Sequence, residues 1–295
     1  MSPETALAAA LERALSQAGK RPLVVGLCGP QGSGKSTLAA AMTRRFDRAV
    51  ALSLDDLYLT RAERDDLART IHPLFATRGP PGTHDVELGL ATLAALDRGE
   101  PVVLPRFDKA IDDRVPNGPM HHAPPGCRLV IFEGWCVGAT PQSPSALHAP
   151  INRLEREEDA AATWRTYANR ALAGGYQQLF ARIDLLVFLR PLDWSAVLGW
   201  RREQEQTLRR SGARGAGLMS DGEIERFVSH YGRLTRHMLE EMPARADLVI
   251  DLDDQRRCLS IEGPVSDDIE ARVRDNIVSS ENGGRSVHPR PTSKS

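Results

Sequence analysis

Cysteine is scarce in this chain of 295 residues, and the few that occur are widely spaced. Four scattered cysteines that form no CxxC pair exclude both a disulfide framework and a cysteine-based zinc site. This usage is typical of a reducing compartment, so we expect a cytoplasmic protein. The four are Cys28, Cys127, Cys136 and Cys258.

Long apolar runs and an excess of charge of one sign are also absent. No run approaches the roughly 20 apolar residues that a bilayer-spanning helix needs. Residues 1–20 mix Ala and Leu with charges and lack a signal-peptide cleavage region, so we expect an amphipathic helix there. The formal net charge of −1 gives no general attraction to nucleic acid or anionic membrane. We expect neither as a partner, and the oligomeric state is left open.

Lysine is the third rarity, because arginine fills almost all of the 38 basic positions. A lysine that lies within a motif is therefore a candidate for a specific role. The four lysines are Lys20, Lys35, Lys109 and Lys294.

What the sequence does contain is an alternation of β-rich runs and helical patterns, which predicts an α/β protein. Such alternation implies right-handed crossovers and a mainly parallel sheet with helices on both faces. Residues 102–107 are a further strand candidate. The main β-rich runs are 23–28, 50–54, 128–132, 185–189 and 248–252. Helices are expected over 36–46, 86–97, 155–180, 194–210 and 221–241.

Two long stretches, 60–83 and 108–127, show neither pattern and are predicted to be irregular. Both follow predicted strands directly, where open α/β sheets bind their ligands, so we expect functional loops. Residues 279–295 are rich in Ser, Gly, Pro and Arg and are predicted to be disordered. Residues 1–278 are then expected to form a single domain.

The strongest motif is GxxxxGKS between a predicted strand and a predicted helix, the context expected of a P-loop, or Walker A motif. Its glycines let backbone N–H groups surround phosphates, and the helix N-terminus adds its positive dipole end. We expect Lys35 to reach the β- and γ-phosphates of ATP and the Ser36 hydroxyl to bind Mg²⁺. The predicted nucleotide-binding residues are Gly29, Pro30, Gln31, Gly32, Ser33, Gly34, Lys35, Ser36 and Thr37.

GTPase signatures do not accompany the P-loop: no Asn-Lys-x-Asp sequence follows, and no DxxG switch follows the third predicted strand. That strand instead leads into Phe-Glu-Gly-Trp, and the carboxylate of Glu133 is a candidate to hold Mg²⁺ directly or through water. The alternative is a solvated acid at a strand end. The second strand leads into a pair of carboxylates, Asp55 and Asp56, suited to accept the proton of an attacking hydroxyl. The alternative is an ordinary turn-forming pair.

Positive charge gathers at two further places. Arg106, Lys109 and Arg114 follow a candidate strand and are a plausible clamp for a carboxylate or phosphate, unless nearby acids neutralise them. Arg201 and Arg209 lie eight residues apart on one face of the helix predicted over 194–210, with a glutamate between them. This spacing fits a solvated, self-paired surface or a lid that closes over ATP, aided by the glycine-rich segment that follows. We favour the lid, over about residues 200–217.

The P-loop motif is followed, in order, by SLDDLYLT (53–60), PGTHD (81–85), LPRFDK (104–109), FEGW (132–135) and GWRREQE (199–205). This series resembles the glycerate 3-kinase family, relatives of phosphoribulokinase, uridine kinase and pantothenate kinase. The resemblance implies a P-loop kinase fold whose five main strands take the order 2-3-1-4-5, with a small helical lid. One departure is that the segment after PRFDK, which should line the acceptor pocket, is shortened to residues 110–114.

The predicted function is therefore Mg·ATP-dependent transfer of a phosphoryl group to a hydroxyl of a small hydroxy acid, with D-glycerate, giving 3-phosphoglycerate, as the first candidate. By resemblance Asp55 is the catalytic base, beside Lys35, and Asp56 supports it. The alternatives are a nucleoside, pantothenate-like acid or sugar as acceptor, or a P-loop ATPase or regulator without one. The predicted substrate-binding residues are Asp56, Tyr58, His84, Asp85, Arg106, Lys109 and Arg114; an ordinary hydrogen-bonded loop histidine is the alternative for His84.

Overall fold

A six-stranded sheet forms the centre of the computed structural model, which describes residues 2–115, 121–210 and 219–263. The strands lie in the order β2-β5-β1-β6-β7-β8, and every pair except the last is parallel. Their bounds are β1 (Leu23–Cys28), β2 (Ala49–Ser53), β5 (Leu129–Gly134), β6 (Leu185–Pro191), β7 (Leu248–Leu252) and β8 (Cys258–Glu262).

The predicted order of the five main strands is confirmed, because β2, β5, β1, β6 and β7 are the second, third, first, fourth and fifth predicted runs. The prediction of only five strands was incomplete. β8 adds a sixth strand at the edge, antiparallel to β7. Its side chains are partly or fully exposed, so its sequence lacks the continuous apolar run by which a buried parallel strand is recognised.

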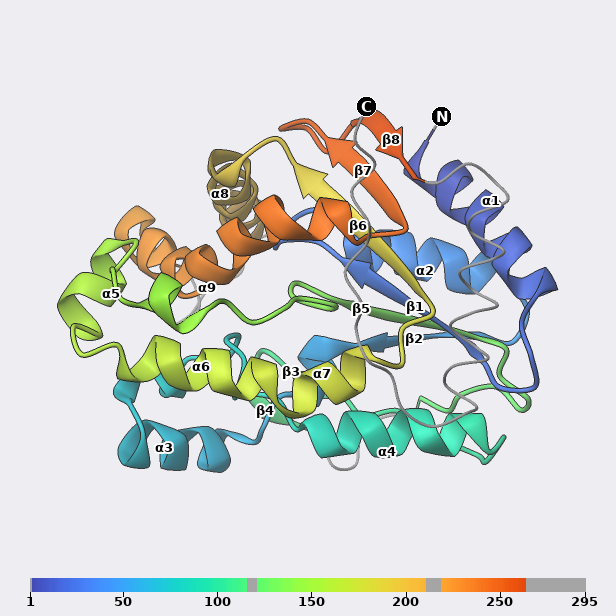
Figure 1. Ribbon diagram of the computed structural model, residues 1–295, viewed down its shortest axis with the longest axis horizontal. Coiled ribbons are helices and arrows are strands. Elements are labelled where there is room, and N and C mark those ends of the chain that lie inside the picture. Colours follow the sequence, from blue (N-terminus) through green and yellow to red (C-terminus); the bar gives the residue numbers. More distant parts are fainter. Residues whose placement is uncertain (1, 116–120, 211–218, 264–295) are drawn as a thin grey trace.

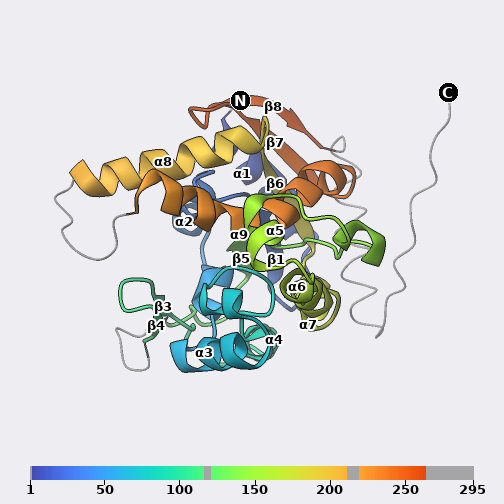
Figure 2. The ribbon, with the colours of Figure 1, turned by 90° about the vertical axis from the view of Figure 1, so that its left-hand side faces the viewer.

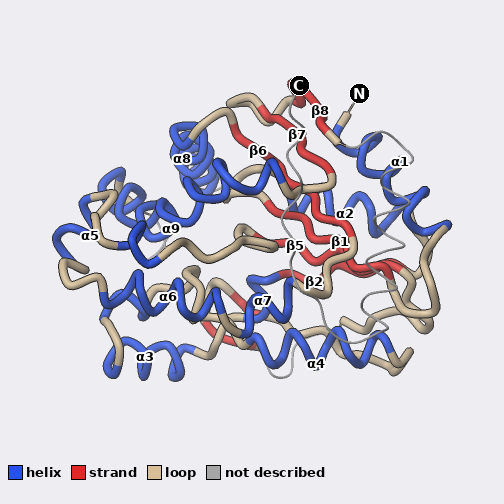
Figure 3. The backbone as a smooth tube through the Cα atoms, viewed as in Figure 1, coloured by secondary structure: helices blue, strands red, loops and turns tan. Residues whose placement is uncertain are grey.

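Helices cover both faces of the sheet, as predicted, and Figures 1 and 3 show the strands between them. Side chains of β1 alternate between two cores: Leu23, Val25 and Leu27 pack with α1, α2 and α8, whereas Val24 and Cys28 pack with α4, α7 and α9. These helices are α1 (Pro3–Ser16), α2 (Lys35–Arg45), α4 (Val86–Asp97), α7 (Gly175–Phe180), α8 (Trp194–Arg210) and α9 (Asp221–Glu241).

The single helix predicted over 155–180 is wrong: this stretch forms α5 (Arg153–Glu158), α6 (Thr163–Ala173) and α7. Asp159 interrupts it, because its carboxylate accepts hydrogen bonds from the backbone N–H groups of Trp164 and Arg165. These bonds satisfy the first turn of α6 and so favour a new helix start.

The stretch 60–83, predicted to be irregular, contains helix α3 (Arg61–Thr70) and the 3-10 helix η2 (Pro73–Ala76). α3 begins with a capping box, in which the side chains of Thr60 and Glu63 each accept a hydrogen bond from the other's backbone N–H. The helix is largely polar, so hydrophobic periodicity does not reveal it.

The strand candidate 102–107 does not join the main sheet. A separate hairpin pairs β3 (Phe107–Asp108) with β4 (Asp113–Arg114). The hairpin contacts the 3-10 helix η1 (Leu54–Leu57), which follows β2, and lies near α3 (Figure 2). The predicted tail, 279–295, and the glycine-rich segment 211–217 lie outside the described residues. Among the described helices, none is long and apolar enough to cross a membrane.

Candidate active site

The P-loop motif connects the end of β1 to the start of α2, as the sequence predicts. Gly32 and Gly34 have φ of +81° and +87°, values that favour glycine. A Cβ on Gly32 would also lie 2.7 Å from the Cβ of Trp200 in α8. Gly34 is the N-cap of α2, so the loop leads straight into a helix N-terminus suited to bind phosphate.

The two predicted metal ligands lie together. Because β1 and β5 are parallel neighbours with Leu27 opposite Glu133, the acid reaches the start of α2, and Ser36 Oγ donates to Glu133 Oε1 at 3.0 Å. Glu133 is 6% exposed, and its Oε2 is buried without a hydrogen-bond partner among the described residues. An unsatisfied carboxylate oxygen beside a hydroxyl fits Mg²⁺, which commonly takes one or two protein ligands plus phosphates and water.

Asp55 lies in η1, just beyond the end of β2. Its Oδ1 accepts a hydrogen bond from Tyr58 OH at 2.9 Å, and its Oδ2 accepts one from Lys109 Nζ at 2.5 Å. Burial raises the pKa of Asp55, but the charges of Lys109 and Lys35 and these two hydrogen bonds outweigh it and lower the pKa to about 2. The P-loop lysine and the predicted base therefore lie close enough to interact electrostatically.

Asp56 has a different environment from its neighbour. Its carboxylate accepts hydrogen bonds from Phe107 N and from Arg106, both at 3.1 Å, and so ties η1 to the hairpin. Burial raises the pKa of Asp56, with these bonds opposing the rise. These contacts suit a supporting residue, which agrees with the role expected of Asp56.

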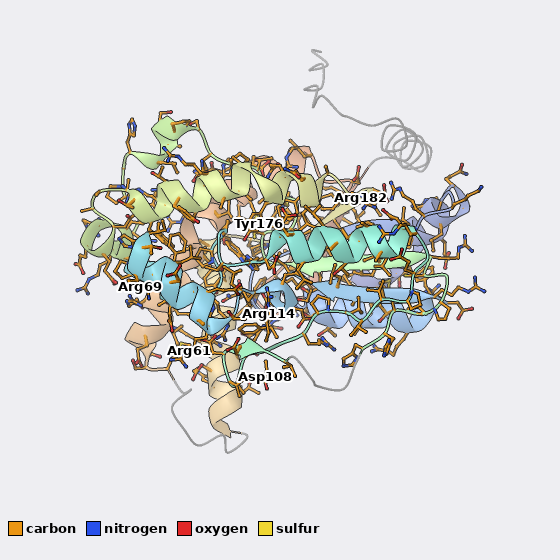
Figure 4. The ribbon with its side chains drawn as sticks, turned by 90° about the horizontal axis from the view of Figure 1, so that it is seen from below. Arg61, Arg69, Asp108, Arg114, Tyr176 and Arg182 are labelled. Atoms are coloured by element: carbon orange, nitrogen blue, oxygen red, sulfur yellow. The ribbon has the colours of Figure 1, made fainter. Side chains whose placement is uncertain are left out.

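The predicted cationic clamp does not converge on one point. Each cation instead pairs with a different acid, and these are not the acids of its own loop. The pairs are Arg106 with Asp56 (3.1 Å), Lys109 with Asp55 (2.5 Å) and Arg114 with Asp85 (2.9 Å). Figure 4 shows the hairpin that carries Asp108 and Arg114 next to Arg61 at the start of α3.

His84 is 5% exposed and stacks on Tyr58, with ring centroids 4.5 Å apart. Its Nδ1 lies 2.6 Å from Tyr176 OH, which also accepts a hydrogen bond from Gly82 N at 2.9 Å. Burial lowers the pKa of His84 to about 3, so the ring is neutral at pH 7. If Tyr176 donates to Nδ1, the hydroxyl is fully used and Nε2 carries the proton; the reverse would leave the hydroxyl hydrogen without an acceptor.

His84 Nε2 is buried and has no partner among the described residues. With that tautomer Nε2 is an N–H donor, and the charge of Asp55 reaches the ring that carries it. Such a donor could hold an acceptor hydroxyl. Asp85, the next residue, has a structural task, because it caps α4 by accepting from Leu88 N at 2.9 Å and also holds Arg114.

We call the region around Asp55, His84 and the β3–β4 hairpin the acceptor side. Two residues that lie there were not predicted from the sequence. Arg78 pairs with Asp112, and its guanidinium lies 5.8 Å from the Phe107 ring centroid. Tyr231 of α9 donates from its hydroxyl to the Arg78 backbone oxygen at 3.1 Å and packs edge-on against Trp135. Arg78 directly precedes the segment Gly-Pro-Pro-Gly-Thr-His-Asp, which could have drawn attention to it. No sequence signal marks Tyr231.

Only part of the predicted lid, residues 200–217, lies within the described residues. Arg201 pairs with the buried Glu205 at 3.1 Å, as the self-paired alternative expects, and lies over the Phe227 ring at 5.4 Å. Arg209 lies in α8, and its side chain is outside the described residues. The lid role of both arginines stays a prediction.

A P-loop joins β1 to α2, an acid lies at the end of the adjacent β5, and an aspartate follows β2 on the other side of β5. On a mainly parallel sheet, these features define a P-loop kinase that acts on small molecules. No known family profile matches the chain. A Schizosaccharomyces pombe protein described as "Uncharacterized kinase mug58" is 39% identical over 225 residues, which are 72% of this chain and 79% of the relative.

The chloroplastic D-glycerate 3-kinase of Arabidopsis thaliana is 30% identical over 257 residues, which are 80% of this chain and 53% of the relative, so the chain spans about half of that protein. The structure of D-glycerate 3-kinase from Cryptococcus neoformans matches with a TM-score of 0.72 and 28% identity, covering 88% of this chain and 97% of that one. The chain belongs to the same kinase family as the Schizosaccharomyces pombe protein, and it is similar to D-glycerate 3-kinases over most of its length.

Proposed function

We propose that the protein transfers the γ-phosphoryl group of ATP to the terminal hydroxyl of D-glycerate, giving 3-phosphoglycerate. The observation that carries the proposal is the position of Asp55, which lies within electrostatic reach of Lys35 and beside a cationic hairpin. Relatives named as D-glycerate 3-kinases support the choice of acceptor.

The nucleotide side would bind the phosphates through the Lys35 ammonium and the N–H groups of the P-loop. Ser36 and Glu133 would hold Mg²⁺, which when bound neutralises phosphate charge. Phosphoryl transfer needs little covalent chemistry from the protein, so positioning and electrostatics carry most of the rate. Arg201 and Arg209 would add positive charge if the lid closes.

On the acceptor side, Asp55 would take the proton of the attacking hydroxyl while the hydroxyl oxygen bonds to the γ-phosphorus. The bond from that phosphorus to the oxygen bridging to the β-phosphate breaks, and ADP leaves. The His84 N–H and Tyr58 would orient the hydroxyl. The carboxylate of glycerate would lie toward Lys109 and Arg78. The terminal hydroxyl of glycerate, which is farthest from its carboxylate, would then lie at Asp55.

A panel of hydroxy acids, nucleosides and sugars with ATP tests the acceptor. We expect ATP consumption that depends on D-glycerate, and a product whose phosphorus couples in ³¹P NMR to the two protons of a CH₂ group. Coupling to a single CH proton would indicate the 2-phosphate and contradict the proposed orientation. Consumption with only a nucleoside or sugar would replace the acceptor, and equal turnover without any acceptor would favour an ATPase.

A further inference from the structure

Of the three cations predicted to form a clamp, Arg106 and Arg114 are structural anchors. Arg114 donates from Nε to the Tyr58 backbone oxygen at 2.8 Å and from its terminal nitrogen to Asp85 at 2.9 Å. Arg106 bonds to Asp56, which also holds the hairpin backbone. Both arginines tie the hairpin to the end of β2 and the start of α4, so displacing either would loosen the hairpin itself.

Lys109 is held quite differently. Among the described residues, its one hydrogen-bonded ion pair is that with Asp55, and its side chain is 59% exposed. The ammonium is the more exposed member of the pair, since the Asp55 side chain is 30% exposed. Water can therefore replace part of what the ammonium loses on leaving Asp55, and a long side chain that must be ordered gains freedom. The ammonium can therefore leave Asp55 without moving the hairpin, provided that another anion receives it.

We propose that Lys109 makes an anionic group on the acceptor a condition for efficient catalysis. Without acceptor it holds Asp55; when an acid binds, the ammonium moves to the acceptor's carboxylate and releases the base. The inference rests on the proposed function and names the substrate class of the same site. A neutral polyol offers the ammonium no new partner, so Asp55 stays engaged.

The chemistry of Asp55 explains why the exchange matters. With Lys109 and Tyr58 in place, both carboxylate oxygens accept hydrogen bonds, and the pKa of about 2 makes Asp55 a weak proton acceptor. Removing the ammonium raises the pKa of Asp55, because the positive charge that counteracts the effect of burial is then lost. The same contact would keep Asp55 from assisting a water molecule, which limits ATP hydrolysis while no acceptor is bound.

The test compares D-glycerate with glycerol, in which a neutral CH₂OH group replaces the carboxylate. In Lys109→Met we expect the ratio of kcat/KM for the two acceptors to fall at least roughly tenfold, mainly through loss of glycerate turnover. Acceptor-free ATP hydrolysis should rise at least about threefold, and the acidic limb of its pH profile should lie at higher pH than in the wild type, because Asp55 loses a neighbouring cation.

Two variants control for structure. Arg106→Met removes a cation from the same segment but not from Asp55, so both acceptors should be affected alike and their ratio kept. Lys109→Arg keeps a cation and should retain most of the ratio. If Lys109→Met lowers turnover of both acceptors equally, or acceptor-free hydrolysis does not rise, the inference is overturned. If the wild type phosphorylates no hydroxy acid, the proposed function fails, and the hydrolysis measurement alone still decides whether Lys109 masks Asp55.

Discussion

The phosphate side of the site is one continuous segment whose glycines set its conformation, whereas the acceptor side is assembled from separate parts of the chain. Residues 29–37 carry most of the predicted phosphate and metal contacts, and Glu133 joins Ser36 from the neighbouring strand. The acceptor side brings together η1, the segment around Arg78 and His84, the hairpin, and tyrosines of α7 and α9.

The two sides are also held by different forces. Backbone geometry and a buried acid fix the P-loop, so its shape tolerates little change. Ion pairs hold much of the acceptor side, and the pair between Lys109 and Asp55 is exposed enough to exchange partners. A rigid nucleotide site beside an adjustable acceptor site allows one phosphate chemistry to serve different acceptors, and the predictions that follow probe this contrast.

The largest effect should come from breaking the phosphate side. Lys35→Ala should lower turnover by roughly 10³-fold or more, because a charge that stabilises the transferring phosphoryl group is lost. Circular dichroism should show an unchanged fold, because the Lys35 side chain is not part of the hydrophobic core. A purified variant that keeps a tenth of the wild-type rate would show that this lysine has another role.

The next effects concern the two neighbouring aspartates, of which Asp55 is the proposed base and Asp56 holds the hairpin. Asp55→Asn should lower kcat by roughly 10²-fold or more with little change in KM for ATP, as expected when a proton acceptor is lost. Asp56→Asn should act mainly on KM for the acceptor, because it loosens the hairpin held through Arg106 and Phe107. Steady-state kinetics of the two variants check this, and the opposite order of kcat effects would assign the base to Asp56.

A smaller effect should follow from Tyr176→Phe. The change removes the hydroxyl that bonds Gly82 N and His84 Nδ1, so His84 is no longer held in one tautomer. We expect kcat/KM for the acceptor to fall by roughly tenfold while KM for ATP is kept. Imidazole ¹⁵N shifts would show which nitrogen of His84 carries the proton. Equal losses toward both substrates would indicate general damage to the site.

The smallest effect concerns pH and stability. Burial lowers the pKa of His84 to about 3 and that of His230 to about 4, so the unfolded state binds their protons first as pH falls. Each should therefore reduce the free energy of unfolding below pH 6.5 by up to about 1.4 kcal/mol per pH unit. Urea titrations between pH 7 and 5 should show a shallower decline for His230→Gln, which lies on α9. An unchanged slope would mean that the folded protein takes up the proton.

Features whose cause is local were predicted from the sequence. The P-loop glycines and the bounds 194–210 and 221–241 of α8 and α9 follow from backbone preference and apolar periodicity. The order of the five main strands was instead implied by the resemblance of the motif series to a kinase family, and the structure confirms it. The encounter of Ser36 with Glu133 follows in turn, because the P-loop leads from the end of β1 into the first turn of α2, beside the end of the adjacent β5.

Only the tertiary structure decided which partner each acceptor-side charge takes. The chain has 38 basic and 39 acidic residues, and no local feature of the sequence predicts that Lys109 pairs with Asp55 and not with the aspartates near it in the sequence. Likewise, Tyr176 meets His84 across 92 residues of chain. Spacing in the sequence records neither contact, because long side chains select partners by distance in the folded molecule, and that distance depends on how the hairpin and helices pack.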